Sequence, residues 1–158
     1  MKKILIKIFL LAFLFFPISC GFKIIDKTKF NNFSIKEIST TGDKRINFKI
    51  RNSLMMESVD GNANHLSIEL SSEKTKIIKE KNIKNEISKY QILIKAEVEF
   101  NLIGKPNDYK INVSSTGDYV VADSYSTTLS NEKKLVDDLV EGLSEKILNE
   151  INLKLNDL

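Results

Sequence analysis

The clearest pattern in the chain is an alternation of apolar and polar residues between positions 91 and 102. It puts Ile92, Ile94, Ala96, Val98, Phe100 and Leu102 on one face, and Gln91, Lys95, Glu97, Glu99 and Asn101 on the other. Leu93 alone interrupts the pattern. Because successive side chains of a β-strand point to opposite faces, this segment predicts a long antiparallel strand with one buried and one polar face.

Weaker alternations lie on both sides of this strand. Residues 66–70 alternate apolar and polar positions and predict another strand, whereas the polar, lysine-rich residues 74–84 read as its end and a connection. Residues 104–108 have a turn-forming composition, and residues 109–113 resume the alternation, which together predict a hairpin. Residues 117–118, Gly-Asp, mark either a bulge or the end of that return strand.

Apolar residues recur every three or four positions near the end of the chain. They form the stripe Leu135, Leu139, Leu143, Ile147, Ile151 and Leu155, widened by Val136, Val140 and Leu148. This spacing predicts a long amphipathic helix, which Ser130 or Asn131 could cap, although an earlier start also fits. Glutamate and aspartate crowd its polar side, where a membrane-surface helix would carry lysine and arginine, so we expect the stripe to pack in a core.

The beginning of the folded part is less regular. Residues 33–38 predict a short first strand, which Gly42 ends, and Asp43 is suited to cap a following helix. Residues 44–56 fit both a strand and a helix, but a length of about three and a half turns after a capping residue favours the helix. Residues 60–62, Asp-Gly-Asn, predict a turn after it.

The element order is therefore strand, helix, strand, strand, strand, helix. It predicts an α+β fold, a two-layer sandwich in which two helices pack on one face of a four-stranded, mostly antiparallel sheet. Residues 33–158 would form this fold as a single α+β domain. The second face of the sheet would remain polar.

The start of the chain has the layout of an export signal. Three lysines within residues 2–7 precede an uncharged apolar run of eleven residues, Ile8 to Ile18. A transmembrane helix needs roughly 20 apolar residues, so a retained membrane anchor is the less favoured alternative. We therefore predict that residues 1–19 are a signal peptide.

Cys20, the only cysteine, follows the sequence Pro17-Ile18-Ser19. A small residue directly before a cysteine at this place resembles the lipobox of bacterial lipoproteins, although Pro17 stands where that motif usually has leucine. Cys20 is thus the predicted lipid-attachment site; a free thiol or an intermolecular disulfide is the alternative. Residues 20–32 would be a lipidated N-terminus and tether, with the acyl chains holding the domain at a membrane surface. Gly21, rather than aspartate, resembles lipoproteins that reach the outer membrane, where this domain would face the periplasm.

Charge and candidate chemistry exclude several classes of function. Removing the three leader lysines from the 24 basic residues leaves 21, which equals the 21 acidic residues, so nothing favours a nucleic-acid partner. The sequence has no nucleophile–base pattern, clustered metal ligands or glycine-rich phosphate loop. His65 is the single histidine, and Glu97 and Glu99 are interpreted as ordinary surface carboxylates. We therefore expect no enzyme, no cofactor and no metal site.

Two parts of the chain resemble a known family. The first is Cys20-Gly21-Phe22, and the second is residues 89–151, with KYQILIKAEVEFNLIGKPNDYKINVSSTGDYVV followed by SNEKKLVDDLVEGLSEKILNEI. Their order resembles the long hairpin, aromatic exit loop and terminal helix of the LPS-assembly lipoprotein LptE family. Tyr119 and Tyr125 stand where that family tends to have aromatics after the last strand. Residues 33–80 match in pattern only.

The resemblance implies an outer-membrane lipoprotein of the lipopolysaccharide translocon. Such a protein plugs a large β-barrel partner, an LptD-like subunit, and helps it assemble. Contact with lipopolysaccharide would involve basic residues near the turn before the long strand, here Lys84 and Lys89; their other interpretation is solvated strand-end lysines. A generic lipid-anchored ligand-binding module is the alternative, but it needs a sizeable apolar pocket, for which a thin two-layer domain offers little room. A lipid-anchored hydrolase, which would need a convergent polar site, is a further rival.

Overall fold

The computed structural model describes residues 33–59, 61–62 and 64–157. The predicted signal peptide, Cys20 and the predicted tether lie outside the described residues. The elements are, in order, β1 (Ser34–Gly42), α2 (Lys44–Glu57), β2 (His65–Lys81), β3 (Ile87–Leu102), β4 (Asp108–Val120) and α3 (Tyr125–Asn156).

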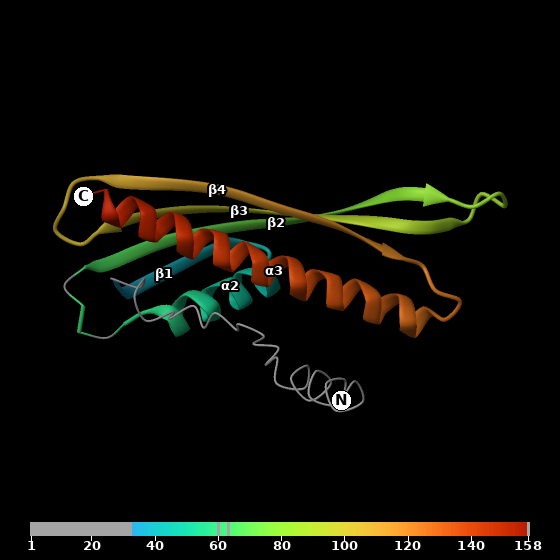
Figure 1. Cartoon of the computed structure of the whole chain (residues 1–158), viewed down its shortest axis with the longest axis horizontal. Helices are drawn as coiled ribbons and strands as arrows, with labels where there is room; N and C mark the ends of the chain where they lie inside the picture. Colours follow the sequence, from blue (N-terminus) through green and yellow to red (C-terminus); the bar gives the residue numbers. More distant parts are fainter. Residues whose placement is uncertain (1–32, 60, 63, 158) are drawn as a thin grey trace, which may run out of the picture.

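The four strands form one open sheet in the order β1-β2-β3-β4. β1 runs parallel to β2, and the other two pairs are antiparallel. Both helices cover the same face of this sheet (Figure 1), so the predicted α+β architecture is confirmed. Within the described part of the chain, neither helix is long and apolar enough to cross a membrane.

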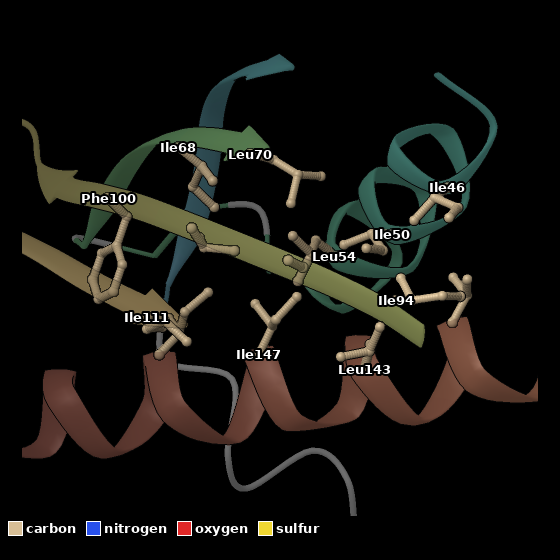
Figure 2. Packing of buried hydrophobic residues seen from close by; sticks show 14 of the residues in the cluster. Ile46, Ile50, Leu54, Ile68, Leu70, Ile94, Phe100, Ile111, Leu143 and Ile147 are labelled. Carbon is tan, nitrogen blue, oxygen red and sulfur yellow. The ribbon is translucent and has the colours of Figure 1, made fainter. Parts of the chain in front are cut away.

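The core lies between the sheet and the two helices. All six apolar residues predicted for the inner face of β3 are buried, because the helices exclude water from that face. Figure 2 shows α2 and α3 directing apolar side chains toward the strands. The labelled residues of this cluster are Ile46, Ile50, Leu54, Ile68, Leu70, Ile94, Phe100, Ile111, Leu143 and Ile147.

The transition from β1 to α2 is built from two adjacent residues. Gly42 ends β1 with a positive φ of +89°, a conformation that side chains disfavour. The carboxylate of Asp43 then accepts hydrogen bonds from the backbone N–H groups of Arg45 (2.9 Å) and Ile46 (3.1 Å). The predicted cap and helix are confirmed, and the helical crossover lets the chain return to form β2 parallel to β1.

β2 is longer than the sequence predicts. Residues 74–81, expected as a strand end and connection, continue β2, and the ladder with β3 reaches the pair Lys81 and Ile87. β1 stops at the pair Gly42 and Ser72, and the side chains beyond Thr75 are exposed. Because few side chains are buried there, the apolar alternation fades although the backbone pairing persists.

β4 and α3 also differ from the expected boundaries. Gly117 pairs in register with Ile92, so it is neither a bulge nor the strand end, and β4 runs on to Val120. α3 begins at Tyr125 rather than near residue 130, because the hydroxyl of Ser124 caps it by accepting from the N–H of Thr127 (3.1 Å). The first turns of α3 are mostly polar and exposed, so they carry no apolar stripe that could predict them.

Candidate functional site

The end of the β2–β3 hairpin projects beyond the other strands. β4 makes its last pair with β3 at Lys89, and the turn of residues 82–86 lies farther out (Figure 1). The side-chain oxygen of Asn82 accepts from the backbone N–H groups of Lys84 (2.9 Å) and Glu86 (3.0 Å). Asn85 adopts a left-handed conformation with φ of 62°. These bonds give the projecting turn a defined shape.

The two lysines predicted from the family resemblance both lie at this hairpin end, in different environments. Lys84 is in the turn, and its ammonium group has no partner among the described residues. Lys89 is on β3, where it donates to the carboxylate of Glu80 at 2.7 Å. This hydrogen bond raises the pKa of Lys89. Ile83, fully exposed at the tip, adds an apolar side chain beside Lys84. The turn at the hairpin end therefore combines a cation with a fully exposed apolar residue, and Ile77 and Ile78 of β2 are exposed as well.

A charged and aromatic network connects the hairpin to α3. Lys76 on β2 donates to Glu132 on α3 at 2.7 Å, and its ammonium lies 4.1 Å from the ring centre of Tyr90. Tyr119 stacks on Tyr90 with ring centres 5.6 Å apart and donates its hydroxyl proton to Glu132 at 2.8 Å. Sequence reasoning missed this network, because its members come from three strands and a helix and form no local motif.

The pKa shifts in this network favour the charged forms of Lys76 and Glu132. Partial burial disfavours both charges, but the hydrogen bonds between Glu132 and its partners outweigh it, so the pKa of Lys76 is raised and that of Glu132 is lowered. The pKa of Tyr119 is raised by burial and by the adjacent carboxylate. The phenol therefore stays protonated and can donate to Glu132.

We predict that Glu132 makes stability sensitive to acid. Folding lowers the pKa of this carboxyl. Such a group stabilises the fold at a pH above its pKa in the unfolded chain, and this stabilisation is lost as the pH falls through its pKa in the folded protein. Chemical denaturation between about pH 7 and pH 3 should therefore show a larger loss of unfolding free energy for wild type than for Glu132→Gln. Equal losses in both proteins would show that the Lys76–Glu132 contact contributes nothing measurable.

The uncovered face of the sheet, here called the polar face, carries residues Ser67, Glu69, Ser71, Glu73, Lys95, Glu97, Glu99, Lys110, Asn112 and Ser114. Lys110 forms ion pairs with both Glu97 and Glu99, the latter at 2.8 Å. The two carboxylates thus share one cation and have similar surroundings, unlike an acid–base pair. Across the described ranges, no group of three or more histidine, cysteine, aspartate or glutamate residues could hold a metal ion.

His65 begins β2 and has a structural contact. Its ring nitrogen Nδ1 lies 2.7 Å from the hydroxyl oxygen of Ser34, the first residue of β1. This bond links the starts of two parallel strands, in agreement with the interpretation of His65 as an ordinary residue at a strand start.

An apolar groove lies between α2 and the first half of α3, here called the interhelix groove. Its volume is about 680 Å³, more room than the two-layer architecture predicts. The exposed lining surface is mostly apolar, although charged side chains surround it. The lining residues are Asp43, Lys44, Arg45, Ile46, Phe48, Lys49, Lys74, Leu129, Glu132, Lys133, Val136 and Asp137. The only sequence signals for it were Phe48 and Leu129, apolar residues outside the buried stripes of their helices.

Comparison with known proteins identifies the fold. No family model and no curated protein matches the sequence. Rare lipoprotein B from Shewanella oneidensis has a similar structure, with a TM-score of 0.60 at 14% identity over 77% of this chain and 98% of that chain. A chain from Caulobacter crescentus assigned as a lipoprotein gives a TM-score of 0.57 at 13% identity over 76% of this chain and 90% of that one. At such identities the likeness shows a shared fold.

Proposed function

We propose that this chain is an outer-membrane lipoprotein, anchored through Cys20, that plugs and helps assemble the β-barrel translocon for lipopolysaccharide. Its fold is similar to those of two bacterial lipoproteins, and its sequence resembles the LptE family. In this role it is a structural and binding protein rather than an enzyme. Its partner would be a large LptD-like barrel.

The observation that carries the plug role is the polar face. The sheet leaves this face uncovered by either helix, and it offers hydroxyls, amides and charges of both signs rather than an apolar patch. The interior of a large outer-membrane barrel is polar as well. A domain that presents such a face can turn that face toward a wet barrel wall without placing apolar surface against it.

The hairpin end supplies the proposed lipopolysaccharide contact. Lys84 is unpaired within the described residues, and Lys89 is held by Glu80 on the same hairpin. Lipopolysaccharide carries phosphate groups on an acylated base, so an unpaired ammonium beside the exposed Ile83 matches both parts of its chemistry.

The proposal is tested by isolating the protein with its neighbours. Outer membranes are solubilised in mild detergent, the full lipidated chain is captured, and mass spectrometry identifies what remains bound after a high-salt wash. We expect a large barrel protein in about equimolar amount. Glu99→Lys should reduce its recovery by about tenfold, because it removes the ion pair with Lys110 and places two like charges side by side on the proposed interface. Glu145→Lys, on the exposed side of α3, is the matched control and should leave recovery unchanged.

Two outcomes would contradict this function. One is recovery of the lipidated chain alone under the same conditions. The other is normal assembly of the barrel in cells depleted of this protein. Either result would favour the second candidate, a lipid-anchored ligand-binding module, for which the interhelix groove is the specific observation.

A further inference from the structure

The interhelix groove is separate from both surfaces used above. The polar face is the side of the sheet away from the helices, and the hairpin end lies beyond the helices (Figure 1). The groove is bordered by residues 43–49 of α2 and its cap and by residues 129–137 of α3, with Lys74 of β2. We propose that it binds one acyl chain of a single-chain anionic amphiphile, with a carboxylate or phosphate head group.

Among the residues that the structure describes, none covers the apolar part of the groove. Phe48 of α2 is 64% exposed and Leu129 of α3 is 47% exposed, although both are large apolar residues. They border one groove from two different helices, together with Val136 and the buried Ile46. Exposed apolar surface gathered in a concave site is typical of ligand binding, whereas singly scattered residues are not.

The volume limits the size of the ligand. Small-molecule sites are usually about 300–1,000 Å³, and the groove, at about 680 Å³, is within this range. That is the space of roughly 20 water molecules in the liquid. This volume is enough for one acyl chain and too small for the several chains of a lipid A base. The proposed ligand therefore differs from the one proposed for the hairpin end.

The charges around the groove determine the head group. Five lining residues are basic and three are acidic. All three acidic groups are engaged: Asp43 caps α2, Asp137 pairs with Lys49, and Glu132 is bound by Lys74 and Lys76.

The cations that remain available are Lys44, Arg45 and Lys133. In the described part of the chain none of their side chains forms an ion pair, and all three are exposed at the groove. An anionic head group would gain charge-assisted hydrogen bonds from them while its acyl chain covers Phe48 and Leu129. A cationic head group would be repelled by these cations, and a neutral head group would lack the ion-pair attraction, so each would keep only the contact of its acyl chain with the apolar residues.

A photolabelling experiment tests the site. The full lipidated protein is placed in nanodiscs of phosphatidylcholine and irradiated with a diazirine-bearing fatty acid, or with the corresponding fatty alcohol as the neutral control. Mass spectrometry then maps the label. We expect the fatty acid to label segments 44–49 and 129–137, about tenfold more than the alcohol does, because only the acid has an anionic head.

Matched variants separate the acyl chain from the head group. Leu129→Ser should reduce labelling about tenfold by removing apolar contact area, whereas Leu153→Ser, an exposed leucine on the same helix outside the groove, should not. Lys133→Ala should reduce labelling by the acid but not by the alcohol. Lys134→Ala, the neighbouring exposed lysine that does not line the groove, should change neither.

Competition identifies the class of ligand. Unlabelled lysophosphatidic acid should displace the fatty acid, since both have one chain and an anionic head, and inorganic phosphate should not. Displacement by phosphate alone would overturn the proposal, because it would show a simple anion site. Equal labelling by acid and alcohol would overturn it as well, and so would a label confined to the hairpin residues 77–89. None of these results depends on whether a barrel partner is recovered.

Discussion

Replacing Gly42 with alanine is expected to destabilise the fold by about 3 kcal/mol. Gly42 has a φ of +89°, and an added Cβ would lie 2.1 Å from the carbonyl oxygen of Ser72. That oxygen cannot move freely, since it accepts a hydrogen bond from the N–H of Asp43 at 2.8 Å. The conformational strain of the positive φ therefore adds to the clash of the new Cβ with the backbone of Ser72. Urea denaturation would measure the loss of unfolding free energy.

Gly104→Ala is the matched control for this prediction. Gly104 has a similar φ of +91°, but no atom lies within 4 Å of the added Cβ. Only the conformational penalty remains there, about 1 kcal/mol. Equal losses for the two variants would refute the role of the contact between Gly42 and Ser72 in joining β1, α2 and β2.

Truncating Ile147 to alanine is expected to cost about 3 to 4 kcal/mol of unfolding free energy. Its side chain has 0% exposure and lies on the inner face of α3 toward the sheet (Figure 2). The substitution removes packed methyl groups and leaves a cavity, because neither a continuous strand nor a long helix can collapse into the space. Thermal and urea unfolding would both report the change.

The control for Ile147 is Leu153→Ala on the same helix. Leu153 is 59% exposed, so its truncation should change stability by no more than about 0.5 kcal/mol. If both variants lost the same small amount, the long helix would not contribute to the core. A large loss confined to Ile147 would show that α3 stabilises the fold through its buried stripe.

The parts of the strands and helices that bury one face in the core could be predicted from the sequence. Ile94 and Val98 in β3, and Leu143 and Ile147 in α3, occur at the spacing of their elements, and the structure buries all four. Burial on one face imposes a period of two on a strand and of 3.6 on a helix. The pattern therefore survives wherever the rest of the fold covers one face.

The ends of the elements could not be predicted in the same way. The outer part of β2, residues 74–81, is held by backbone pairing with β3 and is largely exposed, so its side chains need no apolar period. The first turns of α3 are equally polar, and the hydroxyl of Ser124 decides where that helix begins. A single capping hydrogen bond leaves a weak signal among many serines.

The candidate sites, too, were only partly predictable from the sequence. The turn containing Lys84 was expected before the long strand, and the structure places it at the end of a projecting hairpin. The Lys76–Glu132 contact and the interhelix groove were not foreseen. Each joins residues more than 50 positions apart, and no local spacing encodes such a meeting.

The types of the elements, their order and the buried face of each follow from local periodicity and from capping residues, so they could be read from the sequence. Tertiary structure alone decided how far the hairpin extends, which charges pair across elements and where an apolar groove stays open. Those features depend on the distance and angle between packed layers. Such geometry is a property of the whole core, and no segment of the chain carries it alone.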